Sequence, residues 1–141
     1  MIYSQSTIYA LEALRYLSSL PKGEVVKTRD MASKLNIPNF FLAKVLLTLV
    51  KHRFIVSIRG PRGGVKLAVD PNKITLYDIF NAMGGMIDLN NKCIIGLKNC
   101  SDNTPCPFHS EWLRFKNEMI RKSKKITLAG ISGRIDNSFS L

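Results

Sequence analysis

The chain has 141 residues, a formal net charge of +11 and an apolar fraction of 45%. This length suits one compact domain with an appended helix and excludes a pair of ordinary enzyme domains, and the apolar fraction excludes a wholly disordered chain. The charge is concentrated, because nine basic residues and a single acid, Asp30, lie between Lys27 and Lys66. Such a basic segment favours a polyanionic partner, nucleic acid first and an anionic membrane surface second.

No targeting or membrane-spanning segment is expected. Residues 1–20 lack a basic start, and Glu12 and Arg15 interrupt their apolar residues. No apolar run approaches the roughly 20 residues that a membrane span needs. A cytoplasmic location is therefore predicted, and in a reducing compartment the three cysteines are not expected to form structural disulfides.

The first half of the chain predicts three helices. Apolar residues at three- and four-residue spacing indicate a helix that ends before residues 21–23. A short helix is expected over residues 29–35, with Thr28 as its N-cap. After a turn at residues 36 and 37, a third helix is predicted from Pro38 to about Lys51. Its predicted buried residues are Phe41, Leu42, Val45, Leu46 and Leu49, and its other face carries Asn39, Ala43, Lys44 and Thr48.

The apolar period then changes from 3.6 to two, which is typical of strands. The alternating residues are Val56 and Ile58 with Ser57 and Arg59, then Val65 and Leu67 with Lys66 and Ala68. Between them lies the turn-forming sequence Gly-Pro-Arg-Gly-Gly at residues 60–64. A β-hairpin with a basic tip is expected here.

The second half predicts two helices separated by a long loop. Thr75 and Asp78 are expected to cap a short helix that ends at Met83. Residues 84–108 have no clear period and contain all the cysteines, and a loop of this length implies a bound ligand or disorder. The last helix, about 109–125, is predicted to pair with another helix, and Gly130 onward is expected to be a loose tail. The predicted pairing seam is Trp112, Phe115, Met119 and Ile126.

Two short helices, a tight turn and a basic hairpin, in this order, are typical of a winged helix-turn-helix over residues 28–68. In that motif the second helix enters the major groove, and the hairpin tip meets the backbone or the minor groove. Each feature alone is also common in proteins that do not bind DNA, so the prediction depends on their combination. The predicted DNA contacts are Thr28, Asn39, Lys44, Ser57, Arg59, Gly60, Pro61 and Arg62.

The long loop carries a candidate metal site formed by Cys93, Cys100 and Cys106, with His109 following. Thiolates and imidazole suit zinc or an iron–sulfur cluster. Closely spaced cysteine pairs, the usual mark of structural zinc, are missing, whereas the Cys106–Pro107 step is typical of ferredoxin-type ligand runs. The alternatives are free thiols in a disordered loop, a metal-free thiol pair that senses oxidants, and a His109 that has no ligand role.

Together these motifs resemble the bacterial winged-helix repressors that include IscR, NsrR, RirA and CymR. The resemblance covers the chain to about residue 127. It lies in Tyr-Ala-Leu-Glu-Ala-Leu at residues 9–14, in Ile-Pro-Asn-Phe-Phe-Leu-Ala-Lys-Val-Leu at residues 37–46, in the Arg-Gly-Pro-Arg-Gly-Gly hairpin tip, and in the cysteine loop before a long helix. It implies a homodimer joined through the C-terminal helices that binds double-stranded DNA at an imperfect palindrome.

The resemblance further implies an iron–sulfur cluster held by Cys93, Cys100 and Cys106. In the IscR branch the fourth ligand is a histidine three residues after the last cysteine, as His109 is here. The nitric-oxide-sensing branch uses an acidic residue where this chain has Ile8, so a [2Fe–2S] cluster is favoured over a [4Fe–4S] cluster. Two departures limit the transfer. Ala43 replaces the glutamate of IscR, so the operator is not implied, and the six-residue first gap between cysteines leaves the cluster type open.

The sequence thus predicts a mainly α fold with a small β wing. Its predicted parts are a winged helix-turn-helix domain (1–84), a cysteine-bearing cluster loop (85–108), a dimerisation helix (109–127) and a flexible tail (128–141). The predicted function is that of a DNA-binding transcriptional regulator, a repressor and not an enzyme, controlled by its cluster. The alternative is a cluster-free regulator of the same fold that senses through thiols or a partner. A thiol redox enzyme is disfavoured because no Cys-x-x-Cys step is present.

Overall fold

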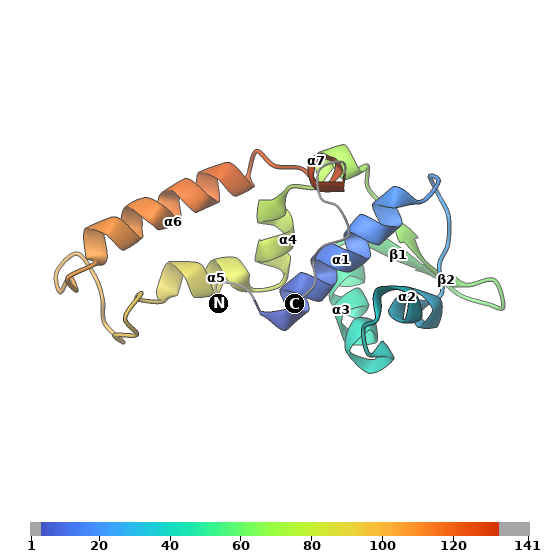
Figure 1. Cartoon of the computed structure of the whole chain (residues 1–141), viewed down its shortest axis with the longest axis horizontal. Coiled ribbons are helices and arrows are strands. Elements are labelled where there is room, and N and C mark those ends of the chain that lie inside the picture. The colour runs from blue at the N-terminus through green and yellow to red at the C-terminus, as the bar shows by residue number, and fades with distance from the viewer. Residues whose placement is uncertain (1–3, 133–141) are drawn as a thin grey trace.

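The computed structural model describes residues 4–132 and is mainly helical with one two-stranded sheet, as predicted (Figure 1). None of the helices in that range is long and apolar enough to cross a membrane. The elements in chain order are α1 (Gln5–Ser19), α2 (Thr28–Leu35), α3 (Asn39–Lys51), β1 (Ile55–Ile58), β2 (Gly64–Leu67), the 3-10 turn η1 (Pro71–Lys73), α4 (Leu76–Ala82), α5 (Gly85–Asn91), α6 (His109–Ser123) and α7 (Leu128–Ser132).

The main core lies between α1, α3 and the hairpin. Apolar residues at three- and four-residue spacing give each helix one buried face, and each buried leucine contributes roughly 2 kcal/mol. The buried residues are Ala10, Ala13, Leu14 and Leu17 in α1 and Leu42, Val45, Leu46 and Leu49 in α3. Phe41, which was expected in this core, is 53% exposed, because the buried stripe of α3 is centred on Leu42 and Leu46 and Phe41 lies on its flank.

The turn between α2 and α3 is set by two residues. Asn36 adopts a left-handed conformation, with φ at 55°, and ends α2. The buried Ile37 then donates its backbone N–H to the carbonyl of Ala32 at 3.0 Å. The prediction that Thr28 caps α2 is wrong. The helical hydrogen bonds begin at the carbonyl of Lys27, so Lys27 is the N-cap and Thr28 lies in the first turn.

The hairpin pairs β1 with β2 in antiparallel register, with Ile55 opposite Leu67 and Ile58 opposite Gly64. A third segment joins it, because Val26 and Val65 exchange backbone hydrogen bonds of 2.9 and 2.8 Å. Ile55 and Val65 anchor the hairpin in the core. The wing is therefore attached to α2 through the segment that precedes that helix.

Gly64 is expected to be a position where any side chain lowers stability. Its φ is +155°, and a Cβ there would overlap the carbonyl oxygen of Val26, which belongs to the bridge beside β2. Gly64→Ala should reduce the free energy of unfolding by about 2 kcal/mol. Urea unfolding followed by circular dichroism measures this. Gly130→Ala, within α7, is the matched control, because its added Cβ meets only an ordinary contact with Thr127. Equal stability of the two variants would contradict the prediction.

The predicted cap of the next helix is confirmed. Thr75 accepts a hydrogen bond from the backbone of Asp78, and the Asp78 carboxylate accepts one from the backbone of Thr75. The following segment differs from the prediction, because residues 85–91 of the expected cluster loop form α5. Phe80, Met86 and Leu89 form a second buried cluster, against which Leu11, Trp112 and Ile120 pack. This cluster joins α4 and α5 to both α1 and α6.

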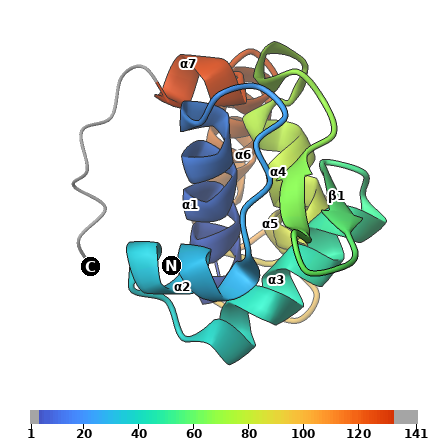
Figure 2. The ribbon, with the colours of Figure 1, turned by 90° about the vertical axis from the view of Figure 1, so that its right-hand side faces the viewer.

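The chain after α6 returns to the first half of the fold, where it packs against α1 and η1. The backbone N–H of Leu128 donates to the carbonyl of Ile74 at 2.8 Å, and Leu128 and Ile131 are buried. In Figure 2, α7 lies against the end of α1. Residues 128–132 are therefore a packed helix and not the start of a flexible tail, and the rest of the predicted tail lies outside the described residues. Ile126 follows the end of α6, so it is not part of a seam along that helix.

Candidate DNA-binding surface and cysteine cluster

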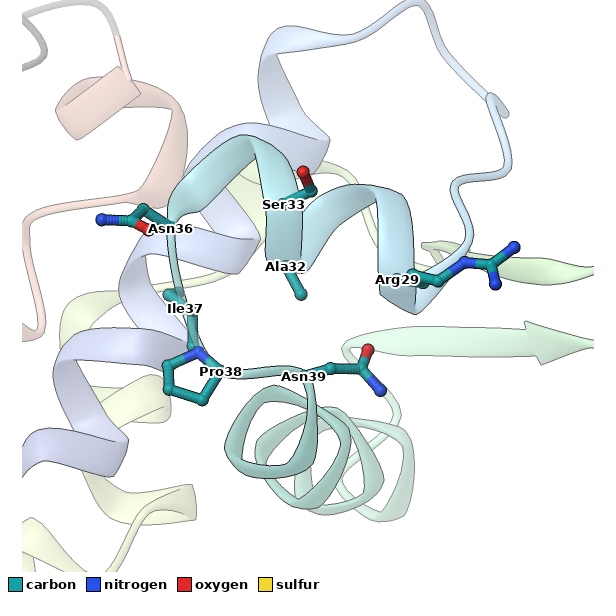
Figure 3. A pocket seen from close by; sticks show the side chains of 7 residues that line it. All are labelled: Arg29, Ala32, Ser33, Asn36, Ile37, Pro38 and Asn39. Carbon is teal, nitrogen blue, oxygen red and sulfur yellow. The ribbon is translucent and has the colours of Figure 1, made fainter.

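A shallow hollow, open to solvent, lies between the two helices of the predicted DNA-binding motif. It is lined by Arg29, Ala32 and Ser33 of α2, by Asn36, Ile37 and Pro38 of the turn, and by Asn39 of α3 (Figure 3). Arg29 and Asn39 are both exposed. Arg29 was not among the predicted DNA contacts, although its position next to Thr28 in the basic segment could have indicated one. The structure thus brings a cationic and an amide side chain to one surface.

Three predicted contact residues lie on α2 and α3. Thr28 is half-buried in the first turn of α2, whose N-terminal amides favour an anion. Asn39 is the first residue of α3 and Lys44 lies five residues further on, both exposed. The Lys44 ammonium lies 4.3 Å from the centre of the Phe40 ring, which directs the ammonium toward the N-terminal end of the helix.

The remaining predicted contacts lie on the wing, with Ser57 in β1 and the others at the tip. Gly60 has a φ of +105°, and its carbonyl accepts a hydrogen bond of 2.9 Å from the backbone of Gly63, which closes the turn. The wing projects at one end of the longest axis of the molecule (Figure 1). Its exposed residues Ser57, Arg59, Gly60, Pro61 and Arg62 are free of the core. Two guanidinium groups on a projecting turn suit phosphate or minor-groove contacts.

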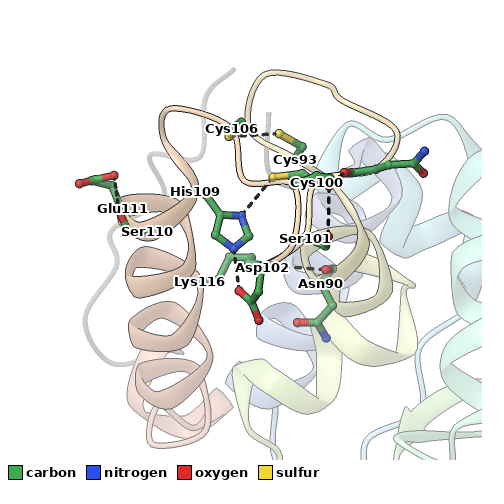
Figure 4. Close-up of polar contacts among 12 residues, drawn as sticks. Asn90, Cys93, Cys100, Ser101, Asp102, Cys106, His109, Ser110, Glu111 and Lys116 are labelled. Atoms are coloured by element: carbon green, nitrogen blue, oxygen red, sulfur yellow. Dashed lines mark hydrogen bonds and ion pairs between the residues drawn. The ribbon is translucent and has the colours of Figure 1, made fainter.

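The cysteine loop lies at the other end of the molecule and gathers its three thiols (Figures 1 and 4). The three Sγ atoms lie within 4.8 Å of one another, and Cys93 is 3.6 Å from Cys106. Cys93 and Cys106 are buried, and Cys100 is half-buried. Cys93 follows α5, and Cys106 precedes α6, so the loop brings together residues that are 13 positions apart.

His109 completes this group as the first residue of α6. Its Nδ1 atom lies 3.1 Å from the Cys100 sulfur, and its Nε2 atom lies 3.0 Å from the Asp102 carboxylate (Figure 4). Asp102 therefore holds the ring with Nδ1 directed at the cysteines, as carboxylates do for histidine ligands of metals. Asp102 was not among the predicted site residues. The only signal for it is an acidic residue two positions after a cysteine.

The thiols differ in their ease of ionisation. The backbone amide of Cys106 and then the His109 side chain lower the pKa of Cys100 to about 7, because both stabilise the thiolate. Burial raises the pKa of Cys106. Asp102, followed by Cys100, raises the pKa of His109 by hydrogen bonding. Cys100 is thus more readily converted to a thiolate ligand than Cys106.

The donor set fits a metal centre. Two thiolates bound to one tetrahedral metal ion at about 2.3 Å stand about 3.8 Å apart. The Cys93 and Cys106 sulfurs are close to that separation, at 3.6 Å. Three thiols and one imidazole are the ligands of zinc sites and of iron–sulfur clusters. The residues present therefore suit such a group without a large rearrangement of the loop.

The predicted pairing seam of α6 is divided between two environments. Trp112 packs against the second buried cluster, and its Nε1–H donates to the carbonyl of Lys92 at 2.9 Å. Phe115 stacks on Trp112 with 5.7 Å between ring centres but is 43% exposed. Met119 is half-buried. Leu113, which the prediction omitted, is 39% exposed but lies on a different side of α6 from Phe115, because residues two positions apart on a helix do not face the same way.

The fold and the basic wing define the class of this protein, a winged helix-turn-helix regulator. The model of the Rrf2 family, described as iron-dependent transcriptional regulators, matches residues 3–133, and the chain belongs to this family. It is 38% identical over 121 residues to a protein of Aquifex aeolicus described as an HTH-type transcriptional regulator, covering 84% of this chain and 83% of that protein. The predicted family and fold class are confirmed.

Solved structures show the same fold. The cysteine regulator CymR of B. subtilis superposes with a TM-score of 0.76 at 22% identity, over 95% of this chain and 98% of CymR. IscR of T. potens superposes with a TM-score of 0.71 at 22% identity, over 97% of this chain and 93% of IscR. The chain is therefore a DNA-binding transcriptional regulator of the Rrf2 family, and the prediction that it is not an enzyme is confirmed.

Proposed function

We propose that this regulator binds an imperfectly palindromic operator as a homodimer and represses transcription, and that an iron–sulfur cluster controls its DNA affinity. Cys93, Cys100, Cys106 and His109 would hold the cluster. The observation that carries this proposal is the gathering of three thiols within 4.8 Å, with the His109 Nδ1 atom 3.1 Å from one of them. As a regulator of transcription the protein would act in the cytoplasm.

The ligand set favours a [2Fe–2S] cluster with one histidine ligand over a [4Fe–4S] cluster. A bound cluster would link its cysteine and histidine ligands to one another. This link would form or be lost with the supply of iron and sulfide or with oxidation. The chain's own part is to present the donors: Asp102 orients His109, and burial keeps water from Cys93 and Cys106. Zinc would use the same donors, so the test below includes sulfide analysis.

The packing suggests how this site communicates with the wing. Cys93 follows α5, and His109 begins α6, so ligation at both would tie the ends of these helices together. Both helices contribute to the cluster of Phe80, Met86 and Leu89, which also contacts Leu11 of α1. Because α1 packs on α3, a change in the α5–α6 arrangement reaches the recognition helix through continuous contacts.

The exposed apolar side chains of α6 support a dimer. Phe115 is the exposed residue that a second copy would cover, with Trp112 three residues before it and Met119 four residues after it on the same side of α6. A dimer must present its two α3 helices about 34 Å apart, one turn of DNA. Small movements of α6 therefore change the fit to an operator.

Anaerobic purification and reconstitution with iron and sulfide test the proposal. The expected result is a coloured protein that contains iron and acid-labile sulfide and whose affinity for DNA differs between cluster-bound and cluster-free forms. A colourless protein without iron and sulfide would refute control by a cluster. Binding of zinc alone would reassign the metal.

The alternative function is a cluster-free regulator that senses oxidants through its thiols. The observation that favours it is the 3.6 Å separation of the Cys93 and Cys106 sulfurs, because this pair needs little movement to form a disulfide. In that case an oxidant would change DNA affinity in protein that holds no iron, and dithiothreitol would reverse the change.

A further inference from the structure

The N-terminal end of α3 carries an exposed aromatic side chain that the fold does not use. Phe40 is 64% exposed, although it is one of the larger apolar residues of the chain. Its ring makes an edge contact with Phe41, with 5.8 Å between ring centres, and the Lys44 ammonium lies 4.3 Å from its centre. Stability of the fold does not explain this residue, since an apolar side chain contributes mainly when it is buried.

Phe40 points away from the protein core. The core-facing residues of α3 recur at three- and four-residue spacing, and Phe40 and Lys44 lie together on the opposite side. This is the side that a recognition helix presents to the major groove, where its N-terminal residues contact base edges. Asn39, which precedes Phe40 in the chain, lines the same hollow as Arg29, so a polar and a basic side chain lie at the start of α3.

The charges near the ring favour a polyanionic partner, here double-stranded DNA. The Lys44 ammonium lies over the ring, and Arg29, Arg59 and Arg62 are exposed in the same basic segment of the chain. A polyanion matches this charge. Within the major groove the one apolar group on a base edge is the C5 methyl of thymine, and phenylalanine is among the side chains that contact it.

We propose that Phe40 is a specificity-determining residue that reads a thymine methyl group in each operator half-site. The proposal rests on the proposed binding of α3 in the major groove. The ring would cover the methyl group and exclude water from it, while the Lys44 ammonium above the ring would neutralise the neighbouring phosphates. Phe40 would thus select thymine at one position without a hydrogen bond.

The test uses the full-length protein and operators selected from a random pool of double-stranded DNA. Each thymine of the best half-site is replaced in turn by deoxyuridine, which lacks only the C5 methyl group. The wild-type protein should lose about fivefold in affinity at one position, the effect of about one buried methyl group. Phe40→Ala should bind the unmodified site more weakly and should show no further loss at that position.

Leu47→Ala is the matched control. Leu47 is also an exposed apolar residue of α3, 70% exposed, but it lies seven residues and roughly 10 Å further along the helix. This variant should keep the wild-type loss on deoxyuridine substitution. Phe40→Leu, which keeps an apolar side chain, should retain part of it, and circular dichroism verifies that all variants are folded.

The outcomes separate this inference from the proposed function. If the wild-type protein selects a site but no deoxyuridine weakens binding, or if Phe40→Ala shows the same loss as the wild type, Phe40 does not read a methyl group. If the wild-type protein selects no site at all, sequence-specific DNA binding by α3 fails, and the inference fails with it.

Discussion

Cys106→Ser is expected to lower the iron and acid-labile sulfide of the anaerobically reconstituted protein to below about one tenth of the wild-type content. The Cys106 sulfur is buried and lies 3.6 Å from that of Cys93, and the Cys106 backbone amide also stabilises the Cys100 thiolate. The serine hydroxyl is a poor ligand for iron, so the site would lose one donor from its most protected position. Metal analysis and visible absorbance measure the effect.

Two variants accompany this measurement. Ser101→Ala changes the exposed residue after Cys100, whose hydroxyl lies 3.2 Å from that of Thr104, and it should keep the wild-type iron content. His109→Ala leaves all three thiols in place, so it should retain more iron than Cys106→Ser but lose it faster when a chelator is added. Full iron and sulfide in Cys106→Ser would mean that the cysteine loop is not the cluster site.

The double variant Arg59→Ala/Arg62→Ala is expected to weaken operator binding about 100-fold at 0.1 M salt. Both guanidinium groups are exposed at the tip of the wing, where only the turn closed by Gly60 and Gly63 supports them. If each contacts one phosphate, the slope of the logarithm of affinity against the logarithm of salt concentration should become shallower by about two per protomer. Titrations at several salt concentrations measure both quantities.

The control for this prediction has the same change in charge. Lys73→Ala/Lys122→Ala removes two exposed cations outside residues 28–68, so only general electrostatic attraction should fall. If the two double variants have equal affinities and equal salt slopes, the wing tip makes no specific contact with DNA.

Features that depend on neighbours in the chain were predictable. The helical spacing of Leu14 and Leu17, the hairpin turn at residues 60–64 and the capping pair of Thr75 and Asp78 are local patterns, and the structure contains all three features. Local patterns did not predict burial correctly where contacts between distant segments determine which side chains are buried. Phe41 has a large apolar side chain, as core residues do, but it lies beside the buried stripe of α3.

Local sequence patterns also did not predict helices α5 and α7. Residues 85–91 contain few strong helix formers, and they are helical where Met86 and Leu89 pack against Phe80. Residues 128–132 read as tail because their partners lie in α1 and η1, far away in the sequence. Propensity is weak in such short segments, and tertiary burial overrides it.

For the candidate site, the sequence alone specified the donor atoms and the basic wing, because cysteines, histidine and arginines in a fixed order are properties of the chain. It could not specify how these donors are spaced, or that Asp102 joins them. The loop between α5 and α6 brings Cys93 beside Cys106 and places His109 between Cys100 and Asp102. The loop's two ends are held by the packing of Trp112 and Ile120 of α6 against the buried cluster that contains Met86 and Leu89 of α5. The residue types determine which donor atoms are available, whereas the distances between those atoms follow from the packing of the folded chain.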